Sequence, residues 1–201
     1  MEVIATLGRT LGFSFAAGLN LYATVALLGL ASRYDWVALP PQFEVFDNDL
    51  VIGVALAMYV IEFCADKIPW VDTAWDTVHT LVRPLGGALI AVAALGEASP
   101  MLQGLVALLG GSVAASSHLT KAGARAMVNT SPEPVSNWVL SLGEDLLVLG
   151  LGFLALGYPV AALVVAGFLL AAILAFFGVI ARLAWRRLFR RPLRADPSGA
   201  A

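Results

Sequence analysis

Ionisable side chains at helical spacing are the first feature of this sequence that could support chemistry. Asp72, Asp76 and His79 are separated by four and three residues, and Arg83 follows four residues later. Because an α-helix repeats every 3.6 residues, this spacing places two carboxylates, an imidazole and a guanidinium along one face. Such a face could bind a cation or pass protons. It could also be the solvated start of a helix, since the helix dipole favours acidic residues there.

Further polar residues lie on either side of this face. Glu62 and Asp66 are four residues apart at the end of an apolar segment, and Lys67 follows them. Later in the chain, Asn137 and Glu144 share a helical face on a segment that opens with a Ser-Pro helix start. Ionisable groups beside membrane segments are functional candidates by default, because burial in hydrocarbon is costly unless they find partners.

The candidate substrate- or ion-binding residues are the polar members of these segments. From the residues themselves they are Asn20, Glu62, Asp66, Lys67, Asp72, Asp76, His79, Lys121, Glu133, Asn137, Glu144 and Asp145. Their oxygen atoms suit a hard cation or a proton relay, so a hard divalent cation is one candidate cofactor. The sequence has no phosphate-binding loop, zinc-ligand spacing or nucleophile elbow, which argues against nucleotide-driven transport and serine hydrolysis.

Composition assigns these residues to a membrane protein. The chain has 201 residues, 60% of them hydrophobic and 13% charged, with a mean hydropathy of +0.86. That is more apolar surface than one soluble core of this size can bury. The net charge of −2 gives no reason to expect a nucleic-acid partner. We expect one transmembrane domain over residues 1–188, then a basic and disordered cytosolic tail over 189–201.

The apolar segments predict an all-α, polytopic bundle of about six transmembrane helices. A hydrocarbon core takes about 20 residues per helix. After an interfacial lead-in at 1–10, the expected spans are 12–32, 50–66, a third ending near 95, 101–118, a fifth ending near 156, and 158–182. The Pro-Leu-Gly-Gly stretch at 84–87 predicts a kink or break in the third span.

Charge asymmetry predicts the orientation of the bundle. The arginine-rich segment after residue 181 favours a cytoplasmic C-terminus in contact with anionic lipid headgroups. Six spans would return the N-terminus to the same side. The acidic, aromatic loop at 33–49 is then expected on the opposite side of the membrane.

Two helical hairpins share a plan, which predicts an internal repeat. The segments 50–95 and 101–156 each contain an apolar helix, a Lys near its polar end and a Pro-containing turn before the next helix. Under this hypothesis the helices at 72–95 and 133–156 lie side by side, with Asp76 facing Asn137. Chance agreement between two amphipathic hairpins explains the likeness equally well. Small residues at 110–115 favour close helix packing, either within the chain or in a homo-oligomer.

Three segments together resemble the bacterial integral-membrane family DUF4126. They are AAGLNLYATV, ADKIPWVDTAWDTVHTLVRPLGGAL and TKAGARAMVNTSPEPVSNWVLSLGED, and they cover most of residues 12–155. The resemblance implies a polar core in a small multi-pass protein of the bacterial inner membrane, and it implies no activity. It adds Asn129 and Trp75 to the residues of interest, without assigned roles.

Three functions fit this pattern of residues. The first is a transporter or channel with a carboxylate-lined site for a cation or proton. The second is a membrane-embedded enzyme acting on lipid headgroups, with Asp72 and Asp76 holding Mg²⁺ and His79 or His118 as acid or base. The third is a non-catalytic scaffold whose charges form internal salt bridges. A continuous polar path, a single cytosolic pocket, or complete pairing of the acids with Lys and Arg would distinguish the three.

Adjacent acids late in the chain receive separate roles in this interpretation. Glu144 continues the helical face that includes Asn137 and is expected to be the ligand or proton carrier. Asp145 points about 100° away and is expected to pair with Lys121 or Arg125.

Overall fold

The computed structural model describes residues 2–130 and 134–189, and every regular element in that part of the chain is helical. The α-helices are α1 (Glu2–Leu19), α2 (Leu21–Arg33), α3 (Asp49–Ala65), α4 (Pro69–Leu95), α5 (Pro100–Val128), α6 (Pro134–Gly157) and α7 (Pro159–Phe189). A short 3-10 helix, η1 (Pro41–Phe46), lies between α2 and α3. Proline in the first turn of α4 and α5 suits helix starts, where its missing N–H costs nothing. The expected all-α class is confirmed.

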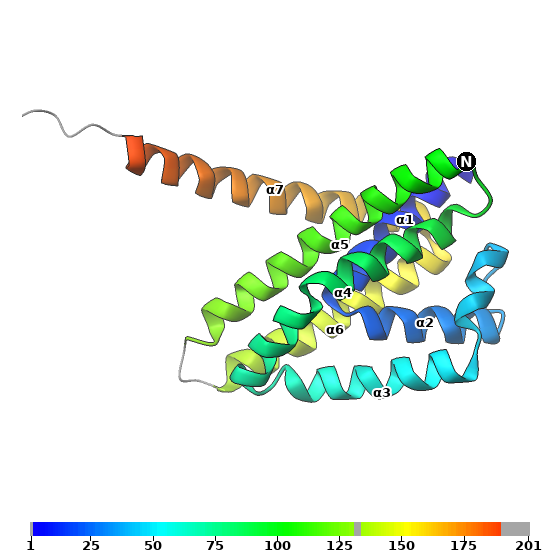
Figure 1. The fold of residues 1–201 in the computed structure, drawn as a ribbon, viewed down its shortest axis with the longest axis horizontal. Coiled ribbons are helices and arrows are strands. Elements are labelled where there is room, and N and C mark those ends of the chain that lie inside the picture. Colours follow the sequence, from blue (N-terminus) through cyan, green and yellow to red (C-terminus); the bar gives the residue numbers. More distant parts are fainter. Residues whose placement is uncertain (1, 131–133, 190–201) are drawn as a thin grey trace, which may run out of the picture.

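Helix α1 lies at the centre of the fold and packs against α4, α5, α6 and α7 (Figure 1). Small residues on α1 permit this close packing. A Cβ atom at Gly18 would overlap Ser117 and the backbone of Ala114 on α5, so only glycine fits there. Ser14 Oγ donates to the Gly87 carbonyl of α4 at 3.1 Å. Ser14 and Gly18, four residues apart on α1, thus form a close-packing surface within the chain.

The predicted span at 12–32 is wrong, because the chain breaks at Asn20 into two helices. Asn20 has extended backbone angles, φ −148° and ψ 99°, and its side-chain Oδ1 accepts a hydrogen bond from the Ala23 amide at 2.9 Å. This is an N-cap, which satisfies a free amide at the start of α2. Figure 1 shows α2 returning toward the side from which α1 begins. The predicted lead-in at 1–10 belongs to α1, which is helical from Glu2.

Helices α4 and α5 form the most extensive hairpin of the fold (Figure 1). A Cβ at Gly110 would overlap the Ala91 side chain, so the small residues of α5 act as expected in bringing two helices together. The predicted break near Pro84 is absent, since α4 continues as one helix from Pro69 to Leu95. The expected pairing of 72–95 with 133–156 is also wrong, because α4 packs on α1 and α5, whereas α6 packs mainly on α1, α2 and α7.

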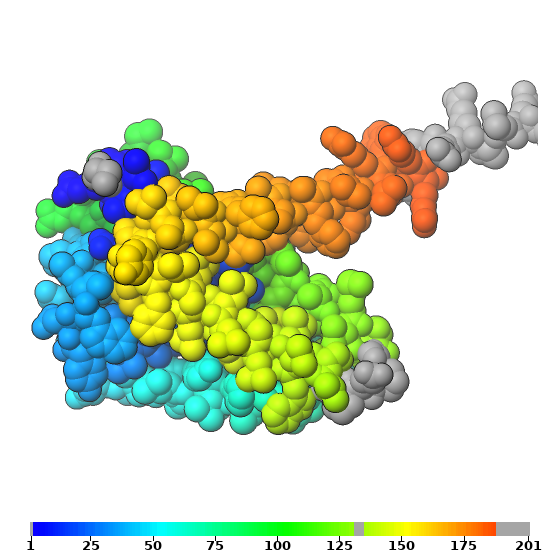
Figure 2. Space-filling view, turned by 180° about the vertical axis from the view of Figure 1, so that it is seen from behind, coloured from blue at the N-terminus to red at the C-terminus, as the bar shows by residue number. Residues whose placement is uncertain are grey.

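Within the described residues, four helices are long and apolar enough to cross a membrane: 69–95, 100–128, 135–157 and 159–187. Helices α1, α2 and α3 have 18, 13 and 17 residues and are shorter. The count of about six spans is therefore not confirmed. The second half of α7 extends beyond the bundle, and its apolar side chains are exposed (Figure 2).

Contacts between distant segments define two ends of the bundle. At the N-terminal end, a Cβ on Gly8 would overlap Pro159 at the turn before α7, and Arg9 Nη2 donates to a carbonyl of the α2–α3 loop at 3.5 Å. At the other end, which we call the Pro69 end, Asn129 Nδ2 donates to the Pro69 carbonyl at 3.4 Å. Figure 1 shows the N-terminus and the far end of α7 on opposite sides of the molecule.

Candidate functional site

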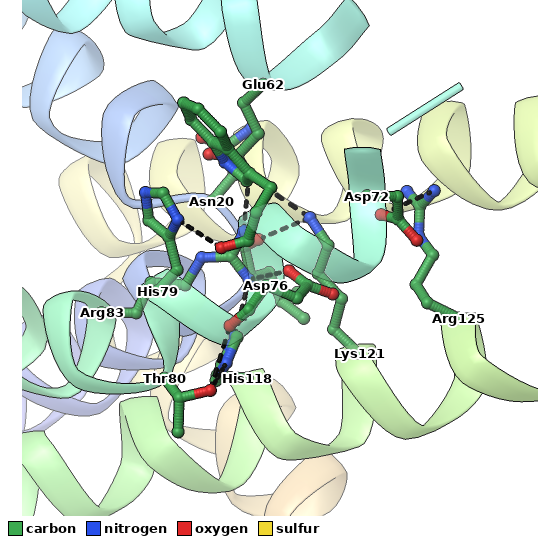
Figure 3. A network of polar contacts seen from close by, with 12 residues as sticks. Asn20, Glu62, Asp72, Asp76, His79, Thr80, Arg83, His118, Lys121 and Arg125 are labelled. Carbon is green, nitrogen blue, oxygen red and sulfur yellow. Dashed lines mark hydrogen bonds and ion pairs between the residues drawn. The ribbon is translucent and has the colours of Figure 1, made fainter. Parts of the chain in front are cut away.

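Charged side chains from α3, α4, α5 and α6 meet inside the bundle near the Pro69 end (Figure 3). Three buried cations, Arg83, Lys121 and Arg125, organise this buried charge network, and each is at most 3% exposed. Its acidic members are Glu62, Asp66, Asp72, Asp76, Glu144 and Asp145, and each is at most 9% exposed. Charges removed from water to this degree are stable only when partners compensate them.

Arg83 on α4 connects three polar groups. Its Nη2 donates to Glu62 Oε1 at 2.8 Å, which ties α4 to the end of α3. Its Nη1 lies 2.7 Å from His118 Nδ1 on α5 and 3.1 Å from Asp76 Oδ1. The contact with Asp76 is an ion pair without hydrogen-bond geometry, since both Asp76 carboxylate oxygens lack a hydrogen-bond partner. Arg83 therefore donates its hydrogen bonds to Glu62 and His118, and only an ion pair connects it to Asp76.

Lys121 on α5 lies between the break in α1–α2 and the acidic residues. Its Nζ donates to the Leu19 carbonyl at 3.1 Å, to Glu62 Oε1 at 3.3 Å and to Asp66 Oδ2 at 3.3 Å. Glu144 Oε2 lies 3.5 Å away. The Leu19 carbonyl belongs to the last turn of α1, where the helix dipole is negative, so a cation there is favourable.

Arg125, one turn farther along α5, makes the shortest ion pair of the network, with Glu144. Its Nη2 donates to Asp66 Oδ2 at 2.9 Å and to Glu144 Oε2 at 2.6 Å. Its Nε reaches Glu144 Oε1 at 3.3 Å, so the guanidinium holds this carboxylate at two points. Asp72 Oδ1 lies 3.6 Å from Nη1. Two-point pairing of this kind fixes the geometry of both partners.

The ion pair with Lys121 or Arg125 that was expected for Asp145 is made by its neighbour Glu144 instead. Glu144 carries the ion pair with Arg125, whereas Asp145 makes no ion pair within the described part of the chain. Asp145 Oδ1 instead accepts a hydrogen bond from Asn20 Nδ2 at 3.4 Å, and its Oδ2 is buried without a hydrogen-bond partner. Helical spacing fixed the angle between the two side chains. It could not fix which of them meets α5, because that depends on how α6 is rotated.

Hydrogen-bond partners determine the protonation of both histidines. An arginine N–H can only donate, so His118 Nδ1 accepts from Arg83 and His118 Nε2 carries the proton that it shares with Thr80 Oγ1 at 3.2 Å. His79 Nδ1 faces the Trp75 carbonyl at 2.7 Å and must donate to it. His79 Nε2 lies 2.9 Å from the Tyr22 hydroxyl, from which it accepts when the ring is neutral. His118 is therefore held neutral in one tautomer, and a neutral His79 carries its proton on Nδ1.

The predicted polar residues nearer the Pro69 end differ in their connection to the network. Asn129 Nδ2 donates to Asp72 Oδ2 at 2.9 Å and so joins it directly. Lys67 Nζ donates to the Phe63 carbonyl at 2.7 Å and to Ser141 Oγ at 3.4 Å. Partial burial lowers the pKa of Lys67 below its usual value. Asn137 is 2% exposed and its Oδ1 has no hydrogen-bond partner. Glu133 lies outside the described residues.

Arg83, Arg125 and His118 belong to the network but were not among the candidate site residues. Arg83 completes the helical face that begins at Asp72. His118, Lys121 and Arg125 are spaced by three and four residues, which was the available signal. The predicted end of the fourth span at 118 placed Lys121 and Arg125 outside the bundle, whereas α5 continues to Val128.

Negative charge exceeds positive charge in this network. The six acids named above face three buried cations, with Lys67 at the edge. Several carboxylate oxygens are buried without a hydrogen-bond partner: Glu62 Oε2, Asp66 Oδ1, Asp72 Oδ1, both oxygens of Asp76, and Asp145 Oδ2. The described residues contain no group of three or more His, Cys, Asp or Glu side chains placed to hold a metal ion. The arrangement can therefore take up protons or a weakly held cation, and it lacks a preformed divalent-metal cage.

Comparison with known proteins identifies the family of this chain. A family model described as "Domain of unknown function (DUF4126)" matches residues 7–178. The chain belongs to this family. No curated protein and no solved structure matches it.

Proposed function

We propose that this DUF4126 family member is a small membrane transporter or channel whose substrate or coupling ion is a cation or a proton. The observation that carries the proposal is the excess of buried carboxylates over buried cations. Unpaired carboxylates at this depth are too costly to remain ionised together, so some of them must bind a proton or a cation. Because the excess of negative charge is small, a site that takes up a proton or cation can also release it.

The broken helix α1–α2 supports the same proposal. Membrane transporters commonly place their sites where a helix is interrupted, because the free carbonyl and amide groups there offer ligands and partial charges. Here Lys121 meets the carbonyl end of α1 at Leu19, and Asp145 meets Asn20 at the amide end of α2. Each charge faces the helix end of opposite dipole sign. The break and the network are thus parts of one site.

The proposed setting is the bacterial inner membrane. We place the Pro69 end and the arginines of α7 in the cytoplasm, as the positive-inside rule favours. Because the chain turns back at Asn20, the N-terminus falls at the opposite end of the bundle (Figure 1). This replaces the expectation that both termini are cytoplasmic.

Five helices would cross the membrane in this arrangement: the four long helices and α3, which is about 25 Å long at 1.5 Å per residue. Helices α1 and α2 would enter and leave on one side. The repeat of α3–α4 in α5–α6 rests on the shared sequence plan alone.

Flux into vesicles tests the proposed function. The purified full chain is reconstituted with a pH-sensitive dye inside, and a pH, Na⁺ or K⁺ gradient is imposed. We expect flux above that of protein-free vesicles, and a fall of about tenfold or more in Asp145→Asn. Glu97→Gln, an exposed acid at the N-terminal end, is the matched control and should keep wild-type flux. Equal leak with and without protein, for all gradients, would refute transport.

A specific observation also favours the scaffold as a second candidate. Five of the six acids have a cationic partner within 4.0 Å, Asp145 being the exception in the described part of the chain. If the charges serve only to lock the helices, charge-neutralising variants will change stability and no gradient will produce flux. The lipid-headgroup enzyme has less support, because Asp72 and Asp76 are joined by no third metal-ligating side chain among the described residues.

A further inference from the structure

A small cavity opens on the seam between α4 and α5, beside the charge network. Its volume is about 120 Å³, and its polar lining consists of Asp72, Thr73, Asp76, Thr77, Thr80 and Arg125. A water molecule occupies roughly 30 Å³ in the liquid, so the cavity has room for an ion and a few waters. Four other pockets in the described part of the chain have no network carboxylate in their lining.

The threonines of this lining present oxygen lone pairs. Thr73, Thr77 and Thr80 each donate their hydroxyl proton to the carbonyl four residues earlier, at 2.9, 2.8 and 3.0 Å. A hydroxyl whose proton is used in this way can only accept. Thr73 Oγ1 already accepts from Asn129 Nδ2 at 3.3 Å, and Thr80 Oγ1 from His118 Nε2 at 3.2 Å, so each keeps one free lone pair. The threonine oxygens therefore add acceptors, and no donors, to the wall of the cavity, with Thr77 the least committed.

Both aspartates of the lining have buried oxygens without hydrogen-bond partners. Asp76 is 5% exposed and neither of its oxygens has a hydrogen-bond partner, and Asp72, 1% exposed, leaves Oδ1 without one. Arg83 and Arg125 contribute only ion pairs to these oxygens, at 3.1 and 3.6 Å, because their N–H groups point to other partners. Buried acceptors in this state require a donor or a cation.

We propose that this cavity binds a partly hydrated alkali-metal cation, with Asp76 as its main ligand and Asp72 and the threonine oxygens around it. Apart from Arg125, whose charge is directed to Asp66 and Glu144, the polar lining consists of acceptors, which select a cation over an anion or a neutral molecule. A divalent ion is disfavoured, because two carboxylates shared with two arginines supply too little negative charge and too few ligands. This inference rests on the proposed function and names its substrate class. The site would be the cytoplasmic access point to the network.

Thermal unfolding of the purified full chain in detergent tests the site directly. Unfolding is followed in LiCl, NaCl, KCl, RbCl and CsCl, with choline chloride keeping the ionic strength constant. A cation that binds only the folded state raises the unfolding temperature in a saturable way. We expect this for at least one alkali ion and not for choline. The concentration giving half the effect should rise by about tenfold or more in Asp76→Asn and in Thr77→Val.

Thr120→Val is the matched control for Thr77→Val. Thr120 makes the same hydrogen bond to a carbonyl one turn earlier, at 2.8 Å to Ser116, but it lies outside the cavity lining. It should leave the ion response unchanged. The proposal is overturned if no alkali ion stabilises the wild type, if only divalent ions do, or if Thr77→Val and Asp76→Asn both respond as the wild type does.

The flux assay separates this inference from the proposed function. Alkali-ion stabilisation that is lost in Thr77→Val, together with vesicles that show no flux, would leave the site standing and remove transport. Flux that persists in both Thr77→Val and Asp76→Asn, without any alkali-specific stabilisation, would retain transport and remove this site.

Discussion

Arg125 donates two hydrogen bonds to Glu144, from Nη2 to Oε2 at 2.6 Å and from Nε to Oε1 at 3.3 Å. The two residues come from α5 and α6, which otherwise touch little. This pair is therefore the main direct tie between these helices near the Pro69 end. Its neighbour Asp145, one residue on, takes no part in it.

Glu144→Gln should destabilise the protein. The amide keeps the shape of the side chain but leaves Arg125 with Asp66 as its only close carboxylate partner, and breaking a buried ion pair costs up to about 3–5 kcal/mol. A lower unfolding temperature in detergent, against an unchanged Glu97→Gln, would show it. An unaltered unfolding temperature would mean that Asp66 alone satisfies Arg125.

Asp145→Asn should leave stability unchanged or raise it, because it removes a carboxylate that has no cationic partner and keeps the acceptor for Asn20. Removing unpaired buried charge is favourable on desolvation grounds. Thermal unfolding measures this, and the same preparation enters the flux assay. A large loss of stability would indicate a cation paired with Asp145. The network would then contain one unpaired carboxylate fewer than described here.

His118 should be neutral with its proton on Nε2. Arg83 Nη1 fills the Nδ1 lone pair at 2.7 Å, and Thr80 Oγ1 lies on the other side of the ring. Nitrogen-15 NMR of selectively labelled protein distinguishes the two tautomers. Arg83→Met removes the donor to Nδ1 and should change the tautomer signal, whereas Arg33→Met, at a partly exposed arginine far from His118 on the α2–α3 side, should not.

Gly18→Val should disrupt folding, because its side chain would overlap Ser117 and the Ala114 backbone on α5. Overpacking of this kind costs about 1–3 kcal/mol or more where backbone must move. Gly104→Val is the matched control, since nothing lies within 4 Å of a Cβ there. Comparable unfolding temperatures for the two variants would contradict the close contact between α1 and α5.

Reporter fusions should place the two termini on opposite sides of the membrane. A fluorescent protein that matures only in the cytoplasm is expected to shine when fused after α7 and to stay dark when fused before α1. A fusion in the 33–49 loop should behave like the N-terminal one. Fluorescence from both terminal fusions would mean that the reversal at Asn20 does not persist in the bilayer.

Sequence patterns identified the polar residues well but not their partners. Spacing showed that Asp72, Asp76 and His79 share a face, and the structure keeps them on one buried side of α4. Spacing within one helix carries no information on which neighbouring helix that face meets. Which helices meet depends on small residues such as Gly18 and Gly110, which allow close contact with residues distant in the sequence.

The break at Asn20 is the largest difference between the predicted and the observed fold. A run of apolar residues from 12 to 32 reads as one span because hydropathy ignores backbone direction. Asn20, a candidate site residue from the sequence, accepts a hydrogen bond from the Ala23 amide and donates one to Asp145. Recognising it as an N-cap would have required weighing its capping preference against the length of the apolar run.

The wide sequence separation within the charge network has a consequence for biogenesis. Lys121 pairs with Glu62 across 59 residues, and Asn20 meets Asp145 across 125. When α5 emerges with Lys121 and Arg125, Glu144 is still inside the ribosome, and a basic residue without its full set of partners costs up to about 2.5–3.5 kcal/mol where an inserting helix takes it into the hydrocarbon. The C-terminal turns of α5 should therefore wait at the membrane surface or beside the insertion machinery until α6 arrives. Ribosome-bound chains halted when α5 has emerged but residue 144 has not would then show these turns accessible to water-soluble reagents that cannot reach them in the finished protein.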